Sequence, residues 1–440
     1  MNSLFKVLAA VGVLAAGSAA AHKLIKKKIE QKREEGDEFG KKGDYMSSIG
    51  WQDLDCLKLV DHEVKVLFDR TKLESIMRRE DYAKLKRVVL CGAGDSWNCA
   101  GVVSEILPEL TGISYETWDP LKATRFVDKD RLTLGVAPRD MLGIGITAGG
   151  GTARVAEWLE KMRACGIRGV CVTNNPEGKC AKAADVVFCT ETPVLISPTV
   201  TNTPGLRSYF ANLLACIAIG CYAGVCNGTL PEDSLETWGE AIKAYVHSWE
   251  NVADEIDNQM FELAKVWKDL WKFDYIGDGP QYYTAQFSEE KPVETAGVLT
   301  SHADCEDWCH INLYCSEPET IGTTFLVDEN SPSLSRMIET VNCAVKLGRP
   351  VLVITNLKDV SVISSGAEIC KVPESPESFK WMMPLMDFFP VTLFANYLCT
   401  LNGRMYFGCY DTDKCLWDEE KRKEIFWCLT TGNSKIEIHK

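Results

Sequence analysis

The sequence is short of positive charge relative to negative charge. It has 48 Lys and Arg residues against 62 Asp and Glu residues, so the formal net charge of the 440-residue chain is −14. A non-specific nucleic-acid binder needs a broad basic surface, and this balance argues against one. The hydrophobic fraction of 46% and the charged fraction of 25% are ordinary for a folded, soluble chain. They exclude a disordered chain and a multi-span membrane protein.

The sequence also lacks the regular cysteine spacing of a small disulfide-bonded protein. Its 19 cysteines are an odd number and are scattered from Cys56 to Cys428. We therefore expect reduced thiols in a reducing compartment, many of them acting as small core side chains. This expectation favours a cytoplasmic location.

Long apolar runs are scarce, and the one at the N-terminus is short for a membrane helix. Residues 4–21 are apolar with a single Lys, whereas a spanning helix needs about 20 residues. Lys23 and Lys26–Lys28 follow the segment, and positive charge there favours keeping that side in the cytoplasm. A membrane tether is thus favoured over a cleaved secretory signal that would end at 19–21. A tail without any targeting role is a third alternative.

Beyond residue 48, short β-branched runs alternate with helical stretches in two separate parts of the chain. We expect strands at 87–91, 142–146, 169–173, 185–189, 274–276, 323–327, 350–355 and 367–372, and helices at 96–107, 152–164, 205–223 and 382–401. This alternation predicts an α/β fold with parallel sheets. The predicted organisation is an apolar segment and linker (1–48), a first domain (49–230), a helical connector (231–272) and a second domain (273–440).

Two glycine-rich loops follow predicted strands of the first domain, at 92–96 (GAGDS) and 147–152 (TAGGGT). Ligands of parallel α/β sheets bind at this edge, and the N-termini of helices attract anions. Glycines let backbone amides approach a phosphate, and hydroxyls add donors. Plain tight turns are the alternative interpretation. A dinucleotide fingerprint fits poorly, because Trp97 stands at the position of its third Gly, and no phosphate-binding G-x-x-x-x-G-K-[ST] motif occurs.

These residues resemble the sugar isomerase (SIS) domain proteins, above all those with tandem SIS domains, such as the isomerase half of glucosamine–fructose-6-phosphate aminotransferase. The Gly-x-Ser of the family's first loop is matched at 94–96. The second loop, Ser-x-Ser-Gly-Glu-Thr in the family, is Thr-Ala-Gly-Gly-Gly-Thr at 147–152, so the middle hydroxyl and the carboxylate are missing. The resemblance implies two SIS-type domains, each a parallel sheet with helices on both faces, joined by a helical linker. It implies that a sugar phosphate is held by Gly94, Ser96, Thr147, Gly149 and Thr152.

The second half resembles the second SIS domain, with a Gly-rich turn at 277–280. By resemblance, Glu294 is the base that moves a proton between C1 and C2, and His310 opens the sugar ring. Their separation of 310 − 294 = 16 residues is that of the family. Lys435 is the candidate amine that attacks or polarises the open carbonyl. Glu294 as a solvated helix residue and Lys435 as part of a charged tail are the alternatives.

A metal role for His310 with Cys305, Cys309 and His302 is disfavoured, because structural zinc sites usually pair two ligand pairs and no second pair stands out. The resemblance implies no metal and no cofactor. It implies a homodimer in which the partner subunit supplies the His, so that the site lies at the subunit interface.

The resemblance leaves two classes of function open. One is an enzyme, an aldose–ketose isomerase, deaminase or deglycase acting on a hexose or aminohexose 6-phosphate. Residues 1–50 are too few for an amidotransferase domain, so we expect no glutaminase activity. The other is a non-catalytic sugar-phosphate-sensing regulatory protein, which the glycines at 149 and 151 favour.

Overall fold

A computed structural model describes residues 41–195, 203–404, 406–409, 420 and 434–438. The apolar segment 4–21 lies outside these residues, so the membrane tether and the secretory signal stay predictions. Two described helices, Arg207–Cys226 and Glu377–Leu401, are long and apolar enough to span a membrane. Their apolar windows are 94% and 100% buried inside the protein, which is the behaviour of core helices.

The first sheet has five parallel strands in the order β2-β1-β3-β4-β5. Their bounds are β1 Arg87–Cys91, β2 Ser114–Trp118, β3 Met141–Ile146, β4 Arg168–Thr173 and β5 Val186–Cys189. Strands β1 and β3 are neighbours and every residue in both is buried. Continuous apolar strands of this kind are expected where helices cover both faces of a parallel sheet.

The second sheet repeats this order. It runs β7-β6-β8-β9-β10, again with all neighbours parallel. Its bounds are β6 Lys272–Ile276, β7 Leu299–Ala303, β8 Ile321–Val327, β9 Val351–Thr355 and β10 Ala367–Lys371. The expected two-part α/β architecture is therefore confirmed. The domain boundaries given above remain a prediction.

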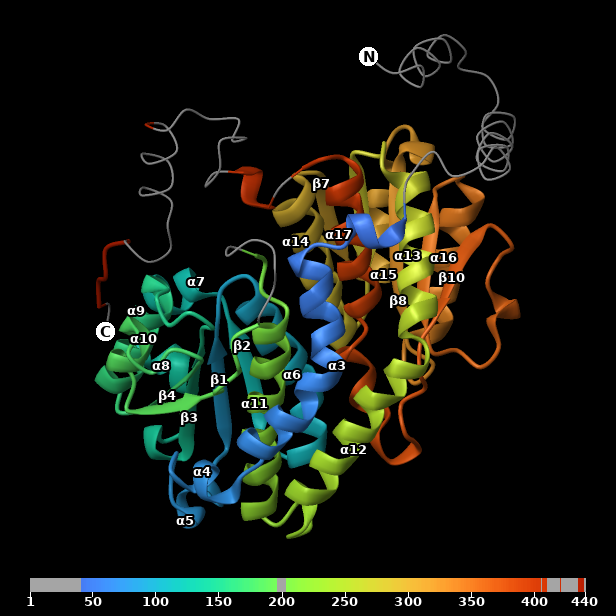
Figure 1. Ribbon diagram of the computed structural model, residues 1–440. Helices are drawn as coiled ribbons and strands as arrows, with labels where there is room; N and C mark the ends of the chain where they lie inside the picture. Colours follow the sequence, from blue (N-terminus) through green and yellow to red (C-terminus); the bar gives the residue numbers. More distant parts are fainter. Residues whose placement is uncertain (1–40, 196–202, 405, 410–419, 421–433, 439–440) are drawn as a thin grey trace.

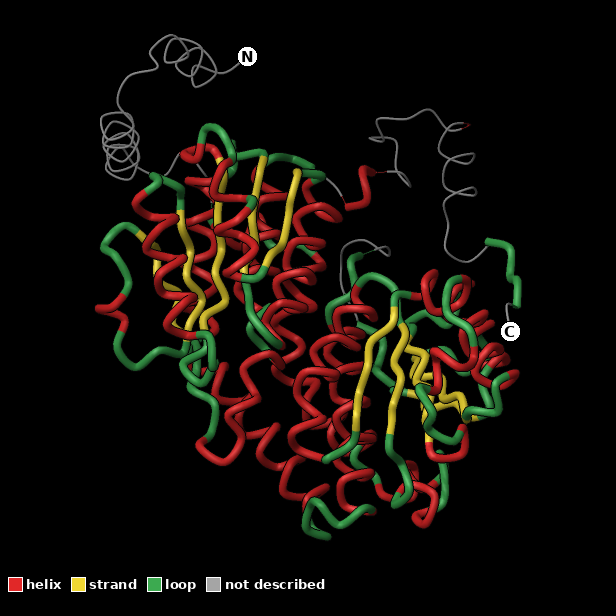
Figure 2. Tube along the Cα trace, turned by 180° about the vertical axis from the view of Figure 1, so that it is seen from behind, coloured by secondary structure: helices red, strands yellow, loops and turns green. Residues whose placement is uncertain are grey.

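The helices between the two sheets form one shared core (Figures 1 and 2). They are α3 Ser48–Leu67, α6 Asp95–Thr111, α11 Arg207–Cys226, α12 Ser234–Ser248, α13 Ala253–Trp267, α14 Pro280–Ala296 and α17 Phe389–Leu401. The largest apolar cluster contains Leu142 of the first sheet and Leu352 of the second, so both sheets pack against the same group of helices. The two halves are thus joined by burial and not merely by the connector.

Shorter helices cover the outer faces of the sheets. The first sheet carries α7 Pro120–Arg125, α8 Lys129–Thr133, α9 Ala153–Ala164 and α10 Lys179–Ala183, and the second carries α15 Cys305–His310 and α16 Leu334–Lys346. Two further short helices, α4 Arg70–Glu74 and α5 Arg79–Tyr82, follow α3. Helices on both faces of each sheet were expected, and the structure confirms them.

The structure contains elements that were not expected, among them helices α3, α14 and α16, and it divides one helix that was expected to be continuous. Strands β2 and β7 were not expected; both are edge strands whose residues alternate little and are mostly half-exposed. The helix expected over 382–401 is divided into a 3₁₀ helix, Glu377–Leu385, and α17, which starts at Phe389 with Pro390 in its first turn. Proline lacks an amide donor and fits the first turn of a helix, so it marks the restart.

The sixteen cysteines whose side chains the structure describes form no disulfide with one another, and most are buried. Burial raises the pKa of thiols such as Cys56 and Cys91 well above the usual value. Such thiols pack as small apolar groups, in line with the reduced state expected from the sequence.

Candidate functional site

The first glycine-rich loop joins β1 to α6. Gly94 precedes the helix with φ of +56°, a conformation that glycine adopts at no steric cost. Ser96 then lies in the first turn of α6 and is buried. Gly94 and Ser96 are thus placed at the carboxyl edge of the sheet, as predicted, and their role in holding a phosphate stays a prediction.

The second loop joins β3, the neighbour of β1, to α9. The hydroxyls of Thr147 and Thr152 lie 3.4 Å apart, one on each side of the loop. Gly149 is exposed at the tip, and its carbonyl accepts a hydrogen bond of 3.1 Å from Asn175 Nδ2. Because β1 and β3 are adjacent and parallel, both loops lie at the same sheet edge. This edge carries two helix N-termini and the hydroxyls of Ser96, Thr147 and Thr152, which is the composition of an anion site.

Glu294 comes to this edge from the other domain. It lies near the end of α14, and Lys291 one turn earlier donates to Glu294 Oε2 at 2.7 Å. The same Lys291 Nζ donates to Asp95 Oδ1 at 2.6 Å, and Asp95 is the first residue of α6. Lys291 is fully buried, whereas the side chains of Asp95 and Glu294 keep 23% and 30% of their surface exposed. The candidate base and the first loop are therefore joined by one ammonium group.

The pKa values of Lys291, Glu294 and Glu290 in this cluster are shifted from their usual values. Burial opposes the charged form of Lys291, but Asp95 and Glu294 outweigh burial and raise its pKa, so it stays an ammonium. Burial raises the pKa of Glu294, and Lys291 offsets part of that rise. Burial and the nearby Asp95 raise the pKa of Glu290, one residue before Lys291, to about 8. A carboxyl whose pKa moves toward neutrality is a better general base or acid than an ordinary one.

Asn98 and Trp97 complete the junction between α6 and α14. Trp97 Nε1 donates to Gln286 Oε1 at 3.1 Å across the two helices. Asn98 is fully buried, and its side chain offsets part of the rise in the pKa of Glu290. Sequence analysis had not singled out Asp95, Asn98 or Lys291 as site residues. The sequence showed only that Lys291 and Glu294 are three residues apart and therefore lie on one face of a helix.

His310 lies elsewhere on the surface of the second domain. It ends α15, its side chain is 67% exposed, and Nε2 pairs with Glu306 Oε1 at 2.9 Å. Glu306 also accepts from Arg336 Nε at 2.7 Å. Within the described residues no hydrogen bond or ion pair links His310 to Glu294. Its exposed position leaves it accessible to a second subunit, and its catalytic role stays a prediction.

The segment 434–438, which contains Lys435, lies against the outer face of the first domain (Figure 1). The side chain of Lys435 is 81% exposed and Nζ pairs with Glu437 Oε1 at 2.7 Å. Its backbone carbonyl accepts from Arg125 Nη2 at 3.3 Å and from Arg154. No described ion pair joins it to Glu294, so the structure does not bring these two candidates into contact. The role of Lys435 also stays a prediction.

The corresponding edge of the second sheet is occupied by carboxylates. Asp278, in the turn after β6, accepts from Cys305 N at 2.8 Å and from Ser333 Oγ at 2.5 Å. Asp328, in the loop after β8, accepts from Asn356 Nδ2 at 2.9 Å. These carboxylates take the donors that a phosphate would need and would repel it. The two sheet edges are chemically different, because the carboxylates at the first edge share the Lys291 ammonium.

The cysteines and histidines around α15 do not converge on a metal. The thiol of Cys305 donates to Asp278 Oδ2 at 3.0 Å, whereas His310 pairs with Glu306. In the part of the chain that the structure describes, no group of three or more His, Cys, Asp or Glu side chains could hold a metal ion.

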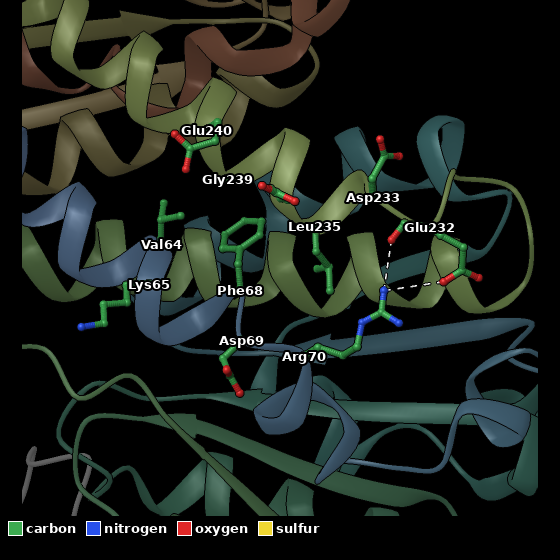
Figure 3. Close-up of a pocket in the computed structure, with 11 residues that line it drawn as sticks. Val64, Lys65, Phe68, Asp69, Arg70, Glu232, Asp233, Leu235, Gly239 and Glu240 are labelled. Carbon is green, nitrogen blue, oxygen red and sulfur yellow. Dashed lines mark hydrogen bonds and ion pairs between the residues drawn. The ribbon is translucent and has the colours of Figure 1, made fainter.

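A separate open cleft of about 400 Å³ lies between the end of α3 and the start of α12 (Figure 3). Val64, Phe68 and Leu235 form its apolar floor. Its rim carries more carboxylates than cations, and Arg70 Nη2 is already engaged by the Glu232 carbonyl at 3.1 Å. None of the candidate site residues lines it, and its charge does not suit a phosphate.

Comparison with known proteins identifies the architecture. The C-terminal domain of glucosamine-fructose-6-phosphate aminotransferase from Francisella tularensis superimposes with a TM-score of 0.68, covering 83% of this chain and 99% of that one at 15% identity. A candidate phosphosugar isomerase from Clostridium difficile gives 0.66, covering 91% and 100% at 15% identity. Glucosamine-6-phosphate deaminase from Thermotoga maritima gives 0.56, covering 80% and 96% at 14% identity.

The chain has the tandem SIS fold. In sequence it is 20% identical over 331 residues to glutamine–fructose-6-phosphate aminotransferase (isomerizing) of Gloeobacter violaceus, covering 73% of this chain. It spans 50% of the length of that relative. No family model matches the chain. The tandem SIS architecture expected from the two loops is thereby confirmed, while the individual site residues are not tested by these likenesses.

Proposed function

We propose that this tandem SIS protein binds a phosphorylated sugar where α6, α14 and the loop 147–152 meet, and that it catalyses proton transfer between C1 and C2. The reaction class is an aldose–ketose isomerase, deaminase or deglycase acting on a hexose or aminohexose 6-phosphate. The observation that carries the proposal is the bridge from Glu294 through Lys291 to Asp95. It fixes a carboxylate of raised pKa beside the first anion-binding loop.

The proposed mechanism assigns separate tasks to the two domains. The amides and hydroxyls of the first-domain loops hold the phosphate. Glu294 removes the proton from one carbon of the open sugar to form an enediol and returns it to the adjacent carbon, with Lys291 stabilising the carboxylate of Glu294 before the first step and after the second. His310 of a second subunit opens the ring, and Lys435 polarises the carbonyl; these two roles rest on the resemblance.

The charge of the site favours a substrate with an amino group. Asp95, Glu290 and Glu294 surround one cation, Lys291. Even with Glu290 protonated, two carboxylates share one ammonium, and both remain partly exposed. A protonated amine on the sugar would supply a second cation for them, whereas a neutral hexose would not. Aminohexose and fructosamine phosphates are accordingly the first substrates to test.

The decisive experiment is exchange of solvent deuterium into C1 or C2 of candidate sugar phosphates. Glu294→Gln should abolish exchange because an amide cannot accept the proton. Glu109→Gln is the matched control: Glu109 is the fifteenth residue of the 17-residue α6, as Glu294 is of the 17-residue α14, but it is exposed and away from the loops. Equal exchange in the parent and in Glu294→Gln would refute the assigned base.

The homodimer can be tested through the site itself. Glu294→Gln removes the proposed base, and His310→Ala removes the proposed ring-opening group. In the proposed dimer these two residues reach one interfacial site from different subunits. Co-expression of the two variants gives mixed dimers with one intact site, so about a quarter of the parental activity should return. No recovery, or a monomer in sedimentation, would contradict a site shared between subunits.

A non-catalytic sensor is the second candidate, and the missing side chains at Gly149 and Gly151 favour it. A sensor and an enzyme both gain stability from the ligand, by about 2.7 kcal/mol at 100-fold above Kd. They differ in exchange chemistry. A sugar phosphate that stabilises the fold without any deuterium exchange would assign the protein to the sensor class.

A further inference from the structure

The last described segment of the chain, 434–438, docks on the first domain although it follows the second. Ile436 packs against the apolar cluster on the outer face of the first sheet. The carbonyl of Lys435 accepts from Arg125 Nη2 at 3.3 Å and from Arg154. The carboxylate of Glu437 pairs with Arg125. The segment is therefore held by its backbone, by an apolar side chain and by charge.

Glu157 of α9 is the centre of this docking site. It is fully buried, and its carboxylate accepts from Arg125 Nε at 2.7 Å, from Arg154 Nη1 at 2.5 Å and from Glu437 N at 2.8 Å. Burial alone would raise the pKa of Glu157, but the hydrogen bonds of Arg125 and Glu437 N and the charge of Arg154 lower it. The group is thus a carboxylate, and one of its acceptor positions is filled by the C-terminal segment itself.

Arg154 connects this docking site to the candidate phosphate loop. It lies in the first turn of α9, two residues after Thr152, which ends the loop. One side of its guanidinium contacts Glu157 and the other the carbonyl of Lys435. A single side chain, that of Arg154, therefore connects the backbone of Lys435 to the N-terminus of α9, where the phosphate is expected.

We propose that Glu157, with Arg125 and Arg154, is a positioning group that docks residues 434–438 and sets Lys435 beside the loop 147–152. What Lys435 does there rests on the proposed function, whereas the docking does not. The exposed ammonium of Lys435 is tethered to Glu437 at 2.7 Å. Docking through the backbone leaves this side chain facing solvent, where a ligand on the loop can reach it.

Hydrogen exchange of the full-length protein tests the docking. In Glu157→Gln the amide of Glu437 loses a charged acceptor, and exchange of the peptide containing 434–438 should accelerate about tenfold or more. Arg154→Ala should act in the same direction. Arg163→Ala is the matched control, since Arg163 lies on the same helix but pairs with Asp185 at 3.0 Å. Glu437→Gln changes only the docked segment, so it tests the docking even if Glu157→Gln fails to fold.

Steady-state kinetics test the positioning. Glu157→Gln should lower kcat about as much as Lys435→Ala while leaving KM within about twofold, and the double variant should lose little more than either single variant. Unchanged exchange in Glu157→Gln and Glu437→Gln would overturn the docking. Faster exchange with parental kcat would overturn the positioning of Lys435. A parent inactive on every sugar phosphate would refute the proposed function, and the exchange result would still uphold or overturn the docking on its own.

Discussion

At the scale of single residues, this protein is defined by charged groups that are buried and shared between partners. Lys291 is fully buried yet serves two carboxylates, and Glu157 is fully buried yet serves two arginines and a backbone amide. Buried charged pairs rarely stabilise a fold more than apolar residues in the same place would. Removing one partner nevertheless destabilises the protein, because the charge of the other partner is then buried without compensation. Lys291 lies at the carboxyl edge of the first sheet, whereas Glu157 lies on α9 at the outer face of that sheet.

Replacing Lys291 with Met should destabilise the protein in a pH-dependent way. Asp95 and Glu294 would lose their shared cation, and about 2–4 kcal/mol of stability should be lost at pH 8, slightly less than for a fully buried pair because both side chains are partly exposed. The loss should shrink toward pH 5, because burial raises the pKa of Glu294 and its carboxyl takes up a proton in the folded state once Lys291 is absent. Urea unfolding at both pH values measures this. Lys243→Met, which removes a surface pair with Glu240, should change stability by less than about 0.5 kcal/mol.

Glu63 on α3 should act against stability at alkaline pH. Burial raises its pKa from an ordinary 4.5 to about 7, and Thr192 and Arg207 offset only part of the rise. The folded state therefore binds a proton that the unfolded chain releases, and stability falls as the pH rises from about 4.5 to 7. Glu63→Gln should be up to about 3 kcal/mol more stable than the parent at pH 8 and similar to it at pH 4. A gain that is equal at both pH values would contradict this account.

At the scale of elements, the candidate site depends on helices α6 and α14, which are structural counterparts in the two domains. α6 and α14 each have 17 residues, each follows a glycine with φ near +57°, and each ends at a left-handed glycine. Trp97 contacts Gln286 and Asp95 contacts Lys291, so residue numbers rise along α6 as they fall along α14 and the two helices run antiparallel. Such a pair has two equivalent ends. Only the end with Asp95, Lys291 and Glu294 carries the cluster of charged side chains, because Pro280, Ile106 and Glu109 occupy the matching positions of the other end.

Close packing of these helices should be needed for the site as well as for stability. A Cβ at Gly101 would overlap the ring of Tyr283 on α14. Gly101→Ala should therefore cost about 1–3 kcal/mol in urea unfolding and weaken sugar-phosphate binding, because Asp95 would move relative to Lys291. Gly43→Ala, where a Cβ meets nothing within 4 Å, should change neither property. If Gly101→Ala changes neither stability nor sugar-phosphate binding, the ring of Tyr283 moves to make room and the helices stay in place.

At the scale of the whole molecule, the two sheets share one core and should unfold together. Leu142 and Leu352 come from different sheets but belong to the same buried cluster. Leu352→Ala should cost about 2–5 kcal/mol, and the midpoints of the far-ultraviolet circular dichroism and tryptophan fluorescence transitions should stay coincident. Two separated transitions would show that the halves are independent domains.

The sequence by itself determined the features that depend on neighbours along the chain. Largely apolar runs at 87–91 and 142–146 predicted the central strands, and glycines after them predicted the turns of the candidate site. Edge strands β2 and β7 escaped this reasoning, since a half-exposed strand lacks both the unbroken apolar run and the strict alternation that mark one.

Only the tertiary structure decided which charged side chains meet. Asp95 and Lys291 are 196 residues apart, and Glu157 and Glu437 are 280 apart. No periodicity links such positions, because their proximity follows from how two sheets pack on one set of helices. The sequence therefore supplied the loops and Glu294, whereas packing supplied the ammonium that joins them and the carboxylate that holds the C-terminal segment in place.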